Sequence, residues 1–400
     1  MDTLLSRHRK KLTNLFAELQ DIAMAPFERG NNCLPLQQNL IKSISSIERQ
    51  IRIKKLTIES MRKELTTRRP VQFTKDQALH IKTGITRCED AVSHYTRLLA
   101  ILREVADGLA FTYLDRFDIK PMAFKASPGF LSGKSGSRLE RQYLRACFKD
   151  KNIAILNDLT NCLRYGDVTV IDREKGLSIA EVKSGKNVTK RDLRQQTAIE
   201  KMRAYFKSDI VDELYGFKGP IRRTSLTSEE KHYRNDLNAL LVASVEGGKS
   251  SYLEVEKGLF YLIEKEENFL LPEITKQIRG RPLVTLINEY KQSNTAYYPF
   301  TLSITSPEHL FQFYAGEFVV MVVIDSEVIT SAFRNNDLTF ELMPEGPWAL
   351  TIRSSKGGDE PIFRVSSHFW GRLPLEFLSL EWFLAEIITS AQRMFPDQRV

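Results

Sequence analysis

Residues 165–185, with the sequence YGDVTVIDREKGLSIAEVKSG, determine how the rest of the chain is organised. The two halves of this stretch are rich in β-branched and other apolar residues, and the polar, glycine-ended segment 172–176 separates them. This pattern predicts two strands joined by a tight turn. A hairpin that is symmetric about Glu174 places Asp167 directly opposite Glu181.

Two carboxylates and an ammonium group fall on one face of the predicted hairpin. Side chains alternate along a strand, so Glu181 and Lys183 point to the same face as Asp167. Like charges that lie opposite each other destabilise a sheet, and a divalent cation between Asp167 and Glu181 would remove that cost. Because carboxylate oxygens are hard ligands, the pattern predicts a site for Mg²⁺ or Mn²⁺.

The order Gly-Asp, short hairpin, Glu-Val-Lys and basic helix resembles the PD-(D/E)xK nuclease superfamily, which includes restriction endonucleases and many repair nucleases. The resemblance places the family's catalytic residues on Asp167, Glu181 and Lys183, and Gly166 stands where the family usually has proline. It covers about a quarter of the chain. It implies a restriction-endonuclease-like αβββαβ core with a mixed sheet, in which residues 237–246 form the last strand.

The same resemblance assigns roles to further residues. Glu140, on the helix before the hairpin, matches an additional metal-associated glutamate, whereas the alternative is a helix capping box with Ser137. The Val182 carbonyl is expected to be a further metal ligand. Gln195 matches a helix glutamine that steadies the active site and has a catalytic role, and Gln196 stays open as an alternative.

Basic residues surround the predicted hairpin, where a phosphate backbone would approach. The net charge of the chain is +8. It divides into +9 for residues 1–135, +5 for 136–246 and −6 for 247–400. Positive potential therefore gathers in the first two segments, which favours a nucleic-acid partner. The residues expected to contact the nucleic acid are Lys186, Lys190, Arg191 and Arg194.

Two heptad patterns, over residues 40–65 and 81–109, predict an antiparallel coiled-coil hairpin. Lys54 is the one polar member of the first pattern. Thr74 and Gln77 predict a capping box at the start of the second helix. This arm would mediate homo-oligomerisation or bind a protein partner, or it would pack on its own protein.

The predicted architecture is α/β of the α+β type, in four parts. Residues 1–120 form a helical, coiled-coil arm, and residues 121–136, which are rich in Pro, Gly and Ser, form a linker. Residues 137–246 form the nuclease-like core. Residues 247–400 form a C-terminal α+β domain whose role is not legible, although it too could bind a partner.

Composition indicates a globular protein of a reducing compartment. Hydrophobic residues make up 42% of the chain, and no apolar run approaches the ~20 residues of a membrane span. The N-terminus lacks the apolar region of a secretory signal. The four cysteines lack zinc-site spacing. We therefore expect a cytoplasmic protein with free thiols and no membrane partner.

The resemblance implies a Mg²⁺- or Mn²⁺-dependent nuclease that hydrolyses phosphodiester bonds, with DNA favoured over RNA. Nucleases of this kind are common in bacterial and phage defence, which is the setting that we expect. The alternative is a catalytically inactive nuclease fold that binds nucleic acid or protein and works with a partner.

Overall fold

The computed structural model describes most of the chain in two compact units, residues 2–223 and 224–400. The boundary falls before the predicted end of the nuclease-like core at residue 246. The described residues are 3–67, 74–123, 129–134, 136–174, 176–182, 190–214, 217–223, 225–265, 270–290, 296–343, 345–356 and 360–394. None of the helices in these ranges has the length and apolar character that a membrane span requires.

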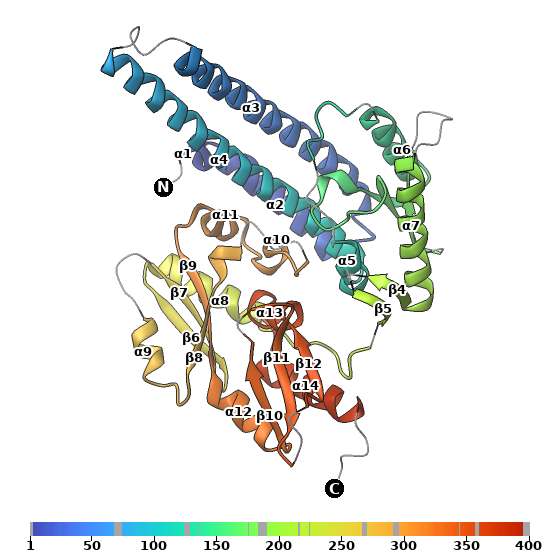
Figure 1. The fold of residues 1–400 in the computed structure, drawn as a ribbon, viewed down its shortest axis with the longest axis vertical. Helices are drawn as coiled ribbons and strands as arrows, with labels where there is room; N and C mark the ends of the chain where they lie inside the picture. The colour runs from blue at the N-terminus through green and yellow to red at the C-terminus, as the bar shows by residue number, and fades with distance from the viewer. Residues whose placement is uncertain are drawn as a thin grey trace. The chain divides into compact units, whose positions relative to one another are not determined.

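The 2–223 unit is built on two long helices, α3 (Cys33–Thr67) and α4 (Lys75–Tyr113). They run antiparallel, because the first residue of α3 contacts the last residue of α4, whereas Arg62 near the end of α3 pairs with Glu89 near the start of α4 (Figure 1). The predicted helical hairpin is confirmed. The capping box of Thr74 is also confirmed, since its hydroxyl accepts from the backbone N–H of Gln77 and the Gln77 side chain accepts in return.

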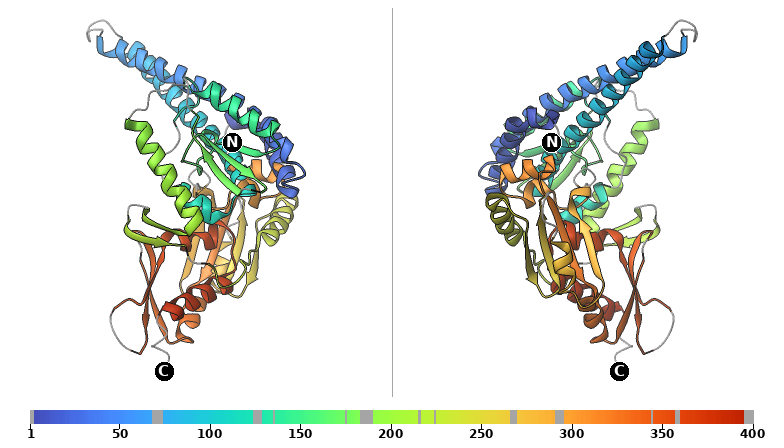
Figure 2. Two further views of the ribbon diagram at one scale, coloured as in Figure 1. Left: turned by 90° about the vertical axis from the view of Figure 1, so that its right-hand side faces the viewer. Right: turned by 90° about the vertical axis from the view of Figure 1, so that its left-hand side faces the viewer.

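Burial changes along this helix pair. Nearly every residue from Leu98 to Ala110 of α4 is buried, so this half of the helix is the centre of the unit's core. Nearer the connected ends, the heptad residues Ile81, Ile85 and Val92 are only half-buried, and so is Lys54 in the seam. The connected ends project beyond the rest of the unit in both views of Figure 2, so they form an arm.

Shorter helices complete the helical layer. Residues 3–24 form a helix that breaks at His8. Its two parts are α1 (Thr3–Arg7) and α2 (Arg9–Met24), and the 3₁₀ turn η1 (Gly30–Asn32) follows. α2 buries one face, as the apolar spacing predicts. Helix α5 (Arg116–Met122) follows α4, and the Asp115 side chain caps it.

A three-stranded antiparallel sheet carries the quoted hairpin. Its strands, in sheet order, are β1 (Ile153–Leu156), β2 (Val168–Asp172) and β3 (Gly176–Ala180). Val168 pairs with Ala180, and Asp172 pairs with Gly176, so the predicted symmetry about Glu174 is confirmed. The flanking elements are α6 (Ser137–Lys149), the 3₁₀ turn η3 (Asn157–Leu159) and α7 (Lys190–Ser208).

The outer edge of β1 is closed by a side chain instead of another strand. The amide of Gln37, fully buried on α3, donates to the Ala154 carbonyl and accepts from the Leu156 N–H, both at 2.8 Å. One side chain thus substitutes for a neighbouring strand at this position, because it supplies both the donor and the acceptor that the β1 backbone needs. The arm and the sheet are therefore hydrogen-bonded into one body.

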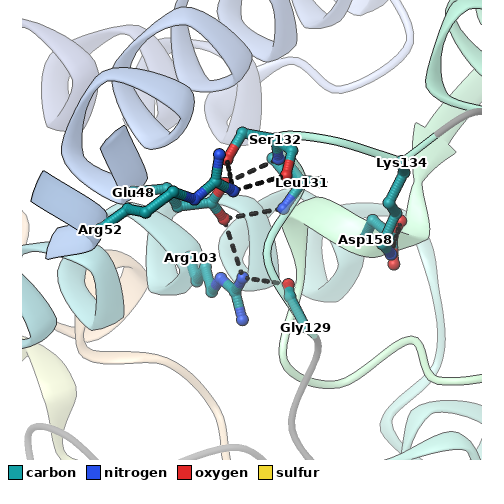
Figure 3. Close-up of polar contacts among 8 residues, drawn as sticks. All are labelled: Glu48, Arg52, Arg103, Gly129, Leu131, Ser132, Lys134 and Asp158. Carbon is teal, nitrogen blue, oxygen red and sulfur yellow. Dashed lines mark hydrogen bonds and ion pairs between the residues drawn. The ribbon is translucent and has the colours of Figure 1, made fainter. Parts of the chain in front are cut away.

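The segment 129–134, which lies within the predicted linker over 121–136, is anchored on the helix pair. The buried Glu48 carboxylate accepts from the Leu131 and Ser132 N–H groups, both at 2.8 Å, and lies 3.6 Å from the Arg103 guanidinium (Figure 3). Arg103 also donates to the Gly129 carbonyl. A Gly/Ser-rich composition suggested flexibility, but buried charged partners on α3 and α4 hold this backbone in place.

The expected last strand of the core, residues 237–246, is instead helix α8 (Arg234–Gly247). Its buried residues Leu237, Leu240, Leu241 and Ser244 recur at helical spacing, and a short apolar run cannot distinguish a strand from a helix. The mixed sheet is wrong for the described residues, whose strand pairings are all antiparallel. After α7, strands β4 (Ile210–Leu214) and β5 (Phe217–Arg222) form a separate two-stranded sheet.

The 224–400 unit contains two antiparallel sheets. The four-stranded sheet has the order β6 (Ser251–Glu256), β7 (Leu259–Glu264), β9 (Val319–Asp325) and β8 (Pro282–Leu286). The three-stranded sheet has the order β10 (Leu338–Leu342), β11 (Trp348–Ser354) and β12 (Phe363–Ser366). In addition to α8, this unit contains the helices α9 (Leu271–Thr275), α10 (Phe300–Ser303), α11 (Pro307–Ala315), α12 (Ser326–Arg334), α13 (Ser367–Leu375) and α14 (Leu380–Met394), and the 3₁₀ turn η4 (Ile287–Tyr290).

Candidate functional site

The acidic ends of the central hairpin come together as the sequence predicts. Asp167 directly precedes β2, and Glu181 and Val182 directly follow β3. The Asp167 N–H donates to the Ala180 carbonyl at 2.8 Å, and the Val182 N–H donates to Asp167 Oδ2 at 2.8 Å. These two bonds continue the pairing beyond the last strand residues, so Asp167 is fixed beside the start of the segment that carries Glu181.

Gly166 has a conformation that explains why proline is not found there. Its φ is +69°, and a Cβ at this position would lie 2.4 Å from Ile179 Cγ2 and 2.8 Å from the Ala180 carbonyl oxygen. Proline fixes φ near −65°, so it cannot take this place. The buried Asn157 side chain supports the turn by donating to the carbonyls of Tyr165 and Gly166. A left-handed turn at Gly166 therefore precedes Asp167.

Glu140 of α6 lies close to the same hairpin end. It is 7% exposed, and its pKa is raised to about 7, first by burial and then by the negative charges of Asp167 and Asp158. Lys134 and Arg141 partly oppose the shift. We name Glu140, Asp158 and Asp167 the acid cluster. Its members lie on α6, in η3 and directly before β2, so tertiary packing brings them together.

The alternative role of Glu140, a capping box with Ser137, is wrong. Ser137 is already the first residue of α6, and the residue before it, Gly136, makes no side-chain cap. A Cβ on Gly136 would lie 3.0 Å from Glu140 Oε1, so the carboxylate folds back toward the start of its own helix. The Glu140 carboxylate therefore does not form a capping box with Ser137, which was the alternative to a role in the site.

Asp158 is the acid cluster residue that the sequence analysis missed. It lies in η3, directly after β1, and pairs with Lys134 of the anchored segment 129–134 (Figure 3). The signal in the sequence is an acid two positions after a fully buried strand, IAIL, at the edge where Asp167 precedes the next strand. This signal is weak without a structure, because the distance from Asp158 to Glu140 depends on how α6 packs.

Glu181 lines a pocket of about 280 Å³ between the end of β3 and α7. The other lining residues are Ile179, Gln196, Ile199, Glu200 and Arg203. Gln196, the alternative to Gln195, therefore shares this pocket with Glu181, and its amide donates to Glu200 Oε1 at 3.2 Å. Gln195 is half-buried on α7 and does not line the pocket.

The predicted basic residues are described only in part. Lys183 and Lys186 lie outside the described residues. Lys190 and Arg191 belong to the first turn of α7, but their side chains also lie outside the described residues. Arg194 is exposed on the same helix. The structure therefore describes the acidic residues of the predicted site, and the position of Lys183 stays a prediction.

The polar groups of the acid cluster are carboxylates, whose oxygens are the donors that hard divalent cations prefer. Among the described residues, no group of three or more His, Cys, Asp or Glu side chains could hold a metal ion as placed. Burial is the largest cause of the raised pKa of Glu140, and the negative charges of Asp167 and Asp158 raise it further, so a cation such as Mg²⁺ or Mn²⁺ bound here would lower it. Among family models, curated proteins and solved structures, the chain has no match.

Proposed function

We propose that the chain is a metal-dependent nuclease that hydrolyses phosphodiester bonds of DNA. The observation that supports it best is the acid cluster, in which burial, and then the charges of Asp167 and Asp158, raise the pKa of Glu140. Folding gains nothing from like charges placed close together, so such a group is typical of a functional site. Glu181, which directly follows β3, adds a further carboxylate.

The order of elements also supports this proposal. The chain runs α6, β1, β2, β3, α7 and β4, which is the αβββαβ order that the resemblance implies. The strand after α7 begins at Ile210, so it precedes the segment 237–246 to which the sequence analysis assigned it. In the described residues β4 pairs with β5 and lies outside the β1–β3 sheet. The similarity to the implied core is therefore in the order of the elements along the chain and not in the pairing of the last strand.

Each residue of the proposed site would have its own role in catalysis. Asp167 and Glu181 would hold Mg²⁺ or Mn²⁺, with Glu140 and the Val182 carbonyl as further ligands. A bound ion of this kind lowers the pKa of water and stabilises charge on a phosphate. Lys183, a compact point charge, would neutralise negative charge on the scissile phosphate. Gln195 or Gln196 would steady these groups from α7.

The basic residues after the hairpin would hold the substrate. Contacts with phosphates fix the position of a nucleic acid and carry no sequence information by themselves. The proposed contacts are Lys186, Lys190, Arg191 and Arg194. We therefore expect this surface to contribute to affinity and to leave base preference unaffected.

A plasmid assay tests the proposal directly. The purified protein is incubated with supercoiled and linear DNA in Mg²⁺, Mn²⁺ or EDTA, beside Asp167→Asn, Glu181→Gln and Lys183→Met. Each substitution is expected to reduce cleavage by more than about 100-fold, because each removes charge from the reacting centre. Glu174→Gln is the matched control, since Glu174 is an exposed acid at the opposite end of the same hairpin.

The outcomes separate the two readings of the fold. Cleavage that Asp167→Asn or Lys183→Met retains, in preparations free of contaminating nuclease, would refute the assignment of the site. A wild-type protein that binds DNA but cleaves neither DNA nor RNA with either metal would instead favour the catalytically inactive module. A role in bacterial or phage defence stays a prediction from the resemblance.

A further inference from the structure

Strand β8 is an open edge of the four-stranded sheet. β9 pairs with it along its whole length without a bulge, and no strand of the described residues pairs with its other side. The Arg281 carbonyl, just before β8, accepts from the Ser326 N–H, just after β9, at 3.1 Å. Backbone groups alternate sides along an antiparallel strand, so those of Pro282, Val284 and Leu286 point away from β9. β8 therefore presents backbone donors and acceptors to a further strand.

Other edge strands of the described residues carry features that prevent pairing with another chain. The edge of β1 is occupied by the Gln37 amide, and Arg203 donates to the Ile179 carbonyl of the edge strand β3 at 2.6 Å. β6, at the opposite edge of the same sheet as β8, contains Glu254 and Glu256 with a bulge between them. Charges, bulges and covered backbone groups are the usual protection of edge strands. β8, with the sequence PLVTL, has neither a charge nor a bulge, and its proline stands at one end.

Val284, at the middle of β8, is exposed although its partner on β9 is buried. It is 44% exposed, whereas Val323, which pairs with it, is fully buried. Val323 belongs to the apolar cluster on this face of the sheet, and Leu286 packs against the same cluster. Val284 therefore extends the apolar face to the edge, where the side chains of an added strand would cover it.

Antiparallel pairing of β8 with a second copy of itself is self-complementary. A two-fold axis at Val284 pairs each Val284 with the other, and each Pro282 with a Leu286. The two valines then exchange both of their backbone hydrogen bonds, and each Leu286 N–H donates to a Pro282 carbonyl. The Pro282 nitrogen carries no proton, so one hydrogen bond is lost at each end of the pair.

The charges beside β8 favour the same arrangement. Arg279 and Arg281 precede the strand, Glu289 follows it, and all three side chains are exposed. The two-fold axis brings the basic end of one copy beside the acidic end of the other. Parallel pairing of two copies would instead place like charges together, which destabilises a sheet. Charge complementarity therefore favours a second copy of this chain, in the antiparallel direction, as the occupant of the edge.

We propose that β8 is the interface of a homodimer, in which two copies of the chain join their four-stranded sheets into one continuous antiparallel sheet. The inference depends on the 224–400 unit and stands whether or not the acid cluster cleaves DNA. One strand from each copy forms a small interface, so the dimer should be reversible, with a dissociation constant on the order of micromolar.

Analytical ultracentrifugation of the full chain, over a series of concentrations through the micromolar range, tests the proposal. The variant is Val284→Lys, which places two like charges opposite each other at the two-fold axis. Its matched control is Val242→Lys, because Val242 is a valine of the same unit, on α8, that is 43% exposed. Far-UV circular dichroism and urea unfolding check that all variants are folded.

We expect wild type and Val242→Lys to change from monomer to dimer as concentration rises. Val284→Lys should raise the dissociation constant at least about tenfold. Arg279→Glu/Arg281→Glu should weaken the dimer as well, and the further change Glu289→Arg should restore it, because opposite charges then meet again at both ends.

A cysteine at the two-fold axis tests the register of the pair. Under mild oxidation Val284→Cys should form a disulfide-linked dimer, because the Cα atoms of a hydrogen-bonded pair lie about 5.5 Å apart, which a disulfide can bridge. Val242→Cys, which keeps the same native cysteines, should not form this dimer.

Three results would overturn the inference. A wild type that stays monomeric would do so, and it is also the result expected if β8 accepts a strand from a different protein. A Val284→Lys variant that dimerises like wild type would place the interface elsewhere. Equal crosslinking of Val284→Cys and Val242→Cys would exclude pairing about Val284. Loss of cleavage in Asp167→Asn leaves the mass of the wild-type protein unaffected, so the two proposals fail separately.

Discussion

Glu48→Ala should destabilise the 2–223 unit by about 4 kcal/mol. Glu48 has no exposed surface, and its carboxylate accepts from the Leu131 and Ser132 N–H groups and faces the Arg103 guanidinium. Each orphaned buried N–H costs about 1–3 kcal/mol, and a buried charge that loses its partner costs about 3–5 kcal/mol. These costs overlap, because water can enter beside the shortened side chain. The total therefore stays near the cost of one buried charge that loses its partner. Glu48→Gln keeps one acceptor oxygen and should lose about half as much.

Urea unfolding with two probes measures this effect. Tryptophan fluorescence reports on the 224–400 unit alone, because all three tryptophans, Trp348, Trp370 and Trp382, lie in it. Far-UV circular dichroism reports on both units. With a slope near ~2.5 kcal/mol per molar urea, the circular-dichroism transition of the 2–223 unit should shift by about 1.5 M. The tryptophan transition should stay in place.

The control is Glu59→Ala, which truncates an exposed glutamate on the same helix and should change the free energy of unfolding by less than about 0.5 kcal/mol. A loss below about 1 kcal/mol in Glu48→Ala would refute the reasoning, because it would mean that the N–H groups and Arg103 find other partners. A matching shift in the tryptophan transition would refute it as well, since the effect would then not be local to the 2–223 unit.

Three further substitutions test the geometry of this unit. The pKa of Glu140 is about 7 in the folded protein and near 4.5 when unfolded, so ionisation destabilises the fold as pH rises through that window. In EDTA, Glu140→Gln should therefore be about 1–2 kcal/mol more stable than wild type at pH 8 and equal to it at pH 4, and a difference independent of pH would contradict this. Gly166→Ala should cost at least about 2 kcal/mol because of its φ of +69° and the close Ile179 side chain, whereas Gly129→Ala, with open space around it, should be neutral. Urea unfolding measures the stability of both glycine variants, and equal losses of stability would exclude strain as the cause. Gln37→Leu should cost about 2–4 kcal/mol and speed hydrogen exchange of the Leu156 amide, and an unprotected amide already in wild type would rule out this role.

The features that the sequence predicts well are local or strictly periodic. The symmetry of the hairpin about Glu174 follows from the position of the turn, and a turn fixes register without help from the rest of the fold. The heptads predict the α3/α4 hairpin for the same reason, since each helix covers the apolar stripe of the other. The capping box at Thr74 involves residues three positions apart and is equally legible.

The features that the sequence does not reveal depend on contacts between distant residues. Glu48 and Leu131 are 83 positions apart, and nothing near residue 131 indicates that a buried carboxylate accepts from its backbone. Asp158 belongs to the acid cluster only because α6 packs over the sheet. The segment 237–246 shows the same limit, since its apolar run suits a buried strand or a buried helix and only its packing decides.

The buried charges at the base of the arm connect the helix pair to the acid cluster. Glu48 belongs to α3, and it holds the segment 129–134. Lys134 of that segment pairs with Asp158 in the acid cluster (Figure 3). A hydrophobic contact would tolerate sliding, whereas a buried carboxylate with fixed donors penalises any shift that leaves them unpaired. We therefore expect the contacts that run from Glu48 through the segment 129–134 to Asp158 to resist sliding of α3 relative to the acid cluster.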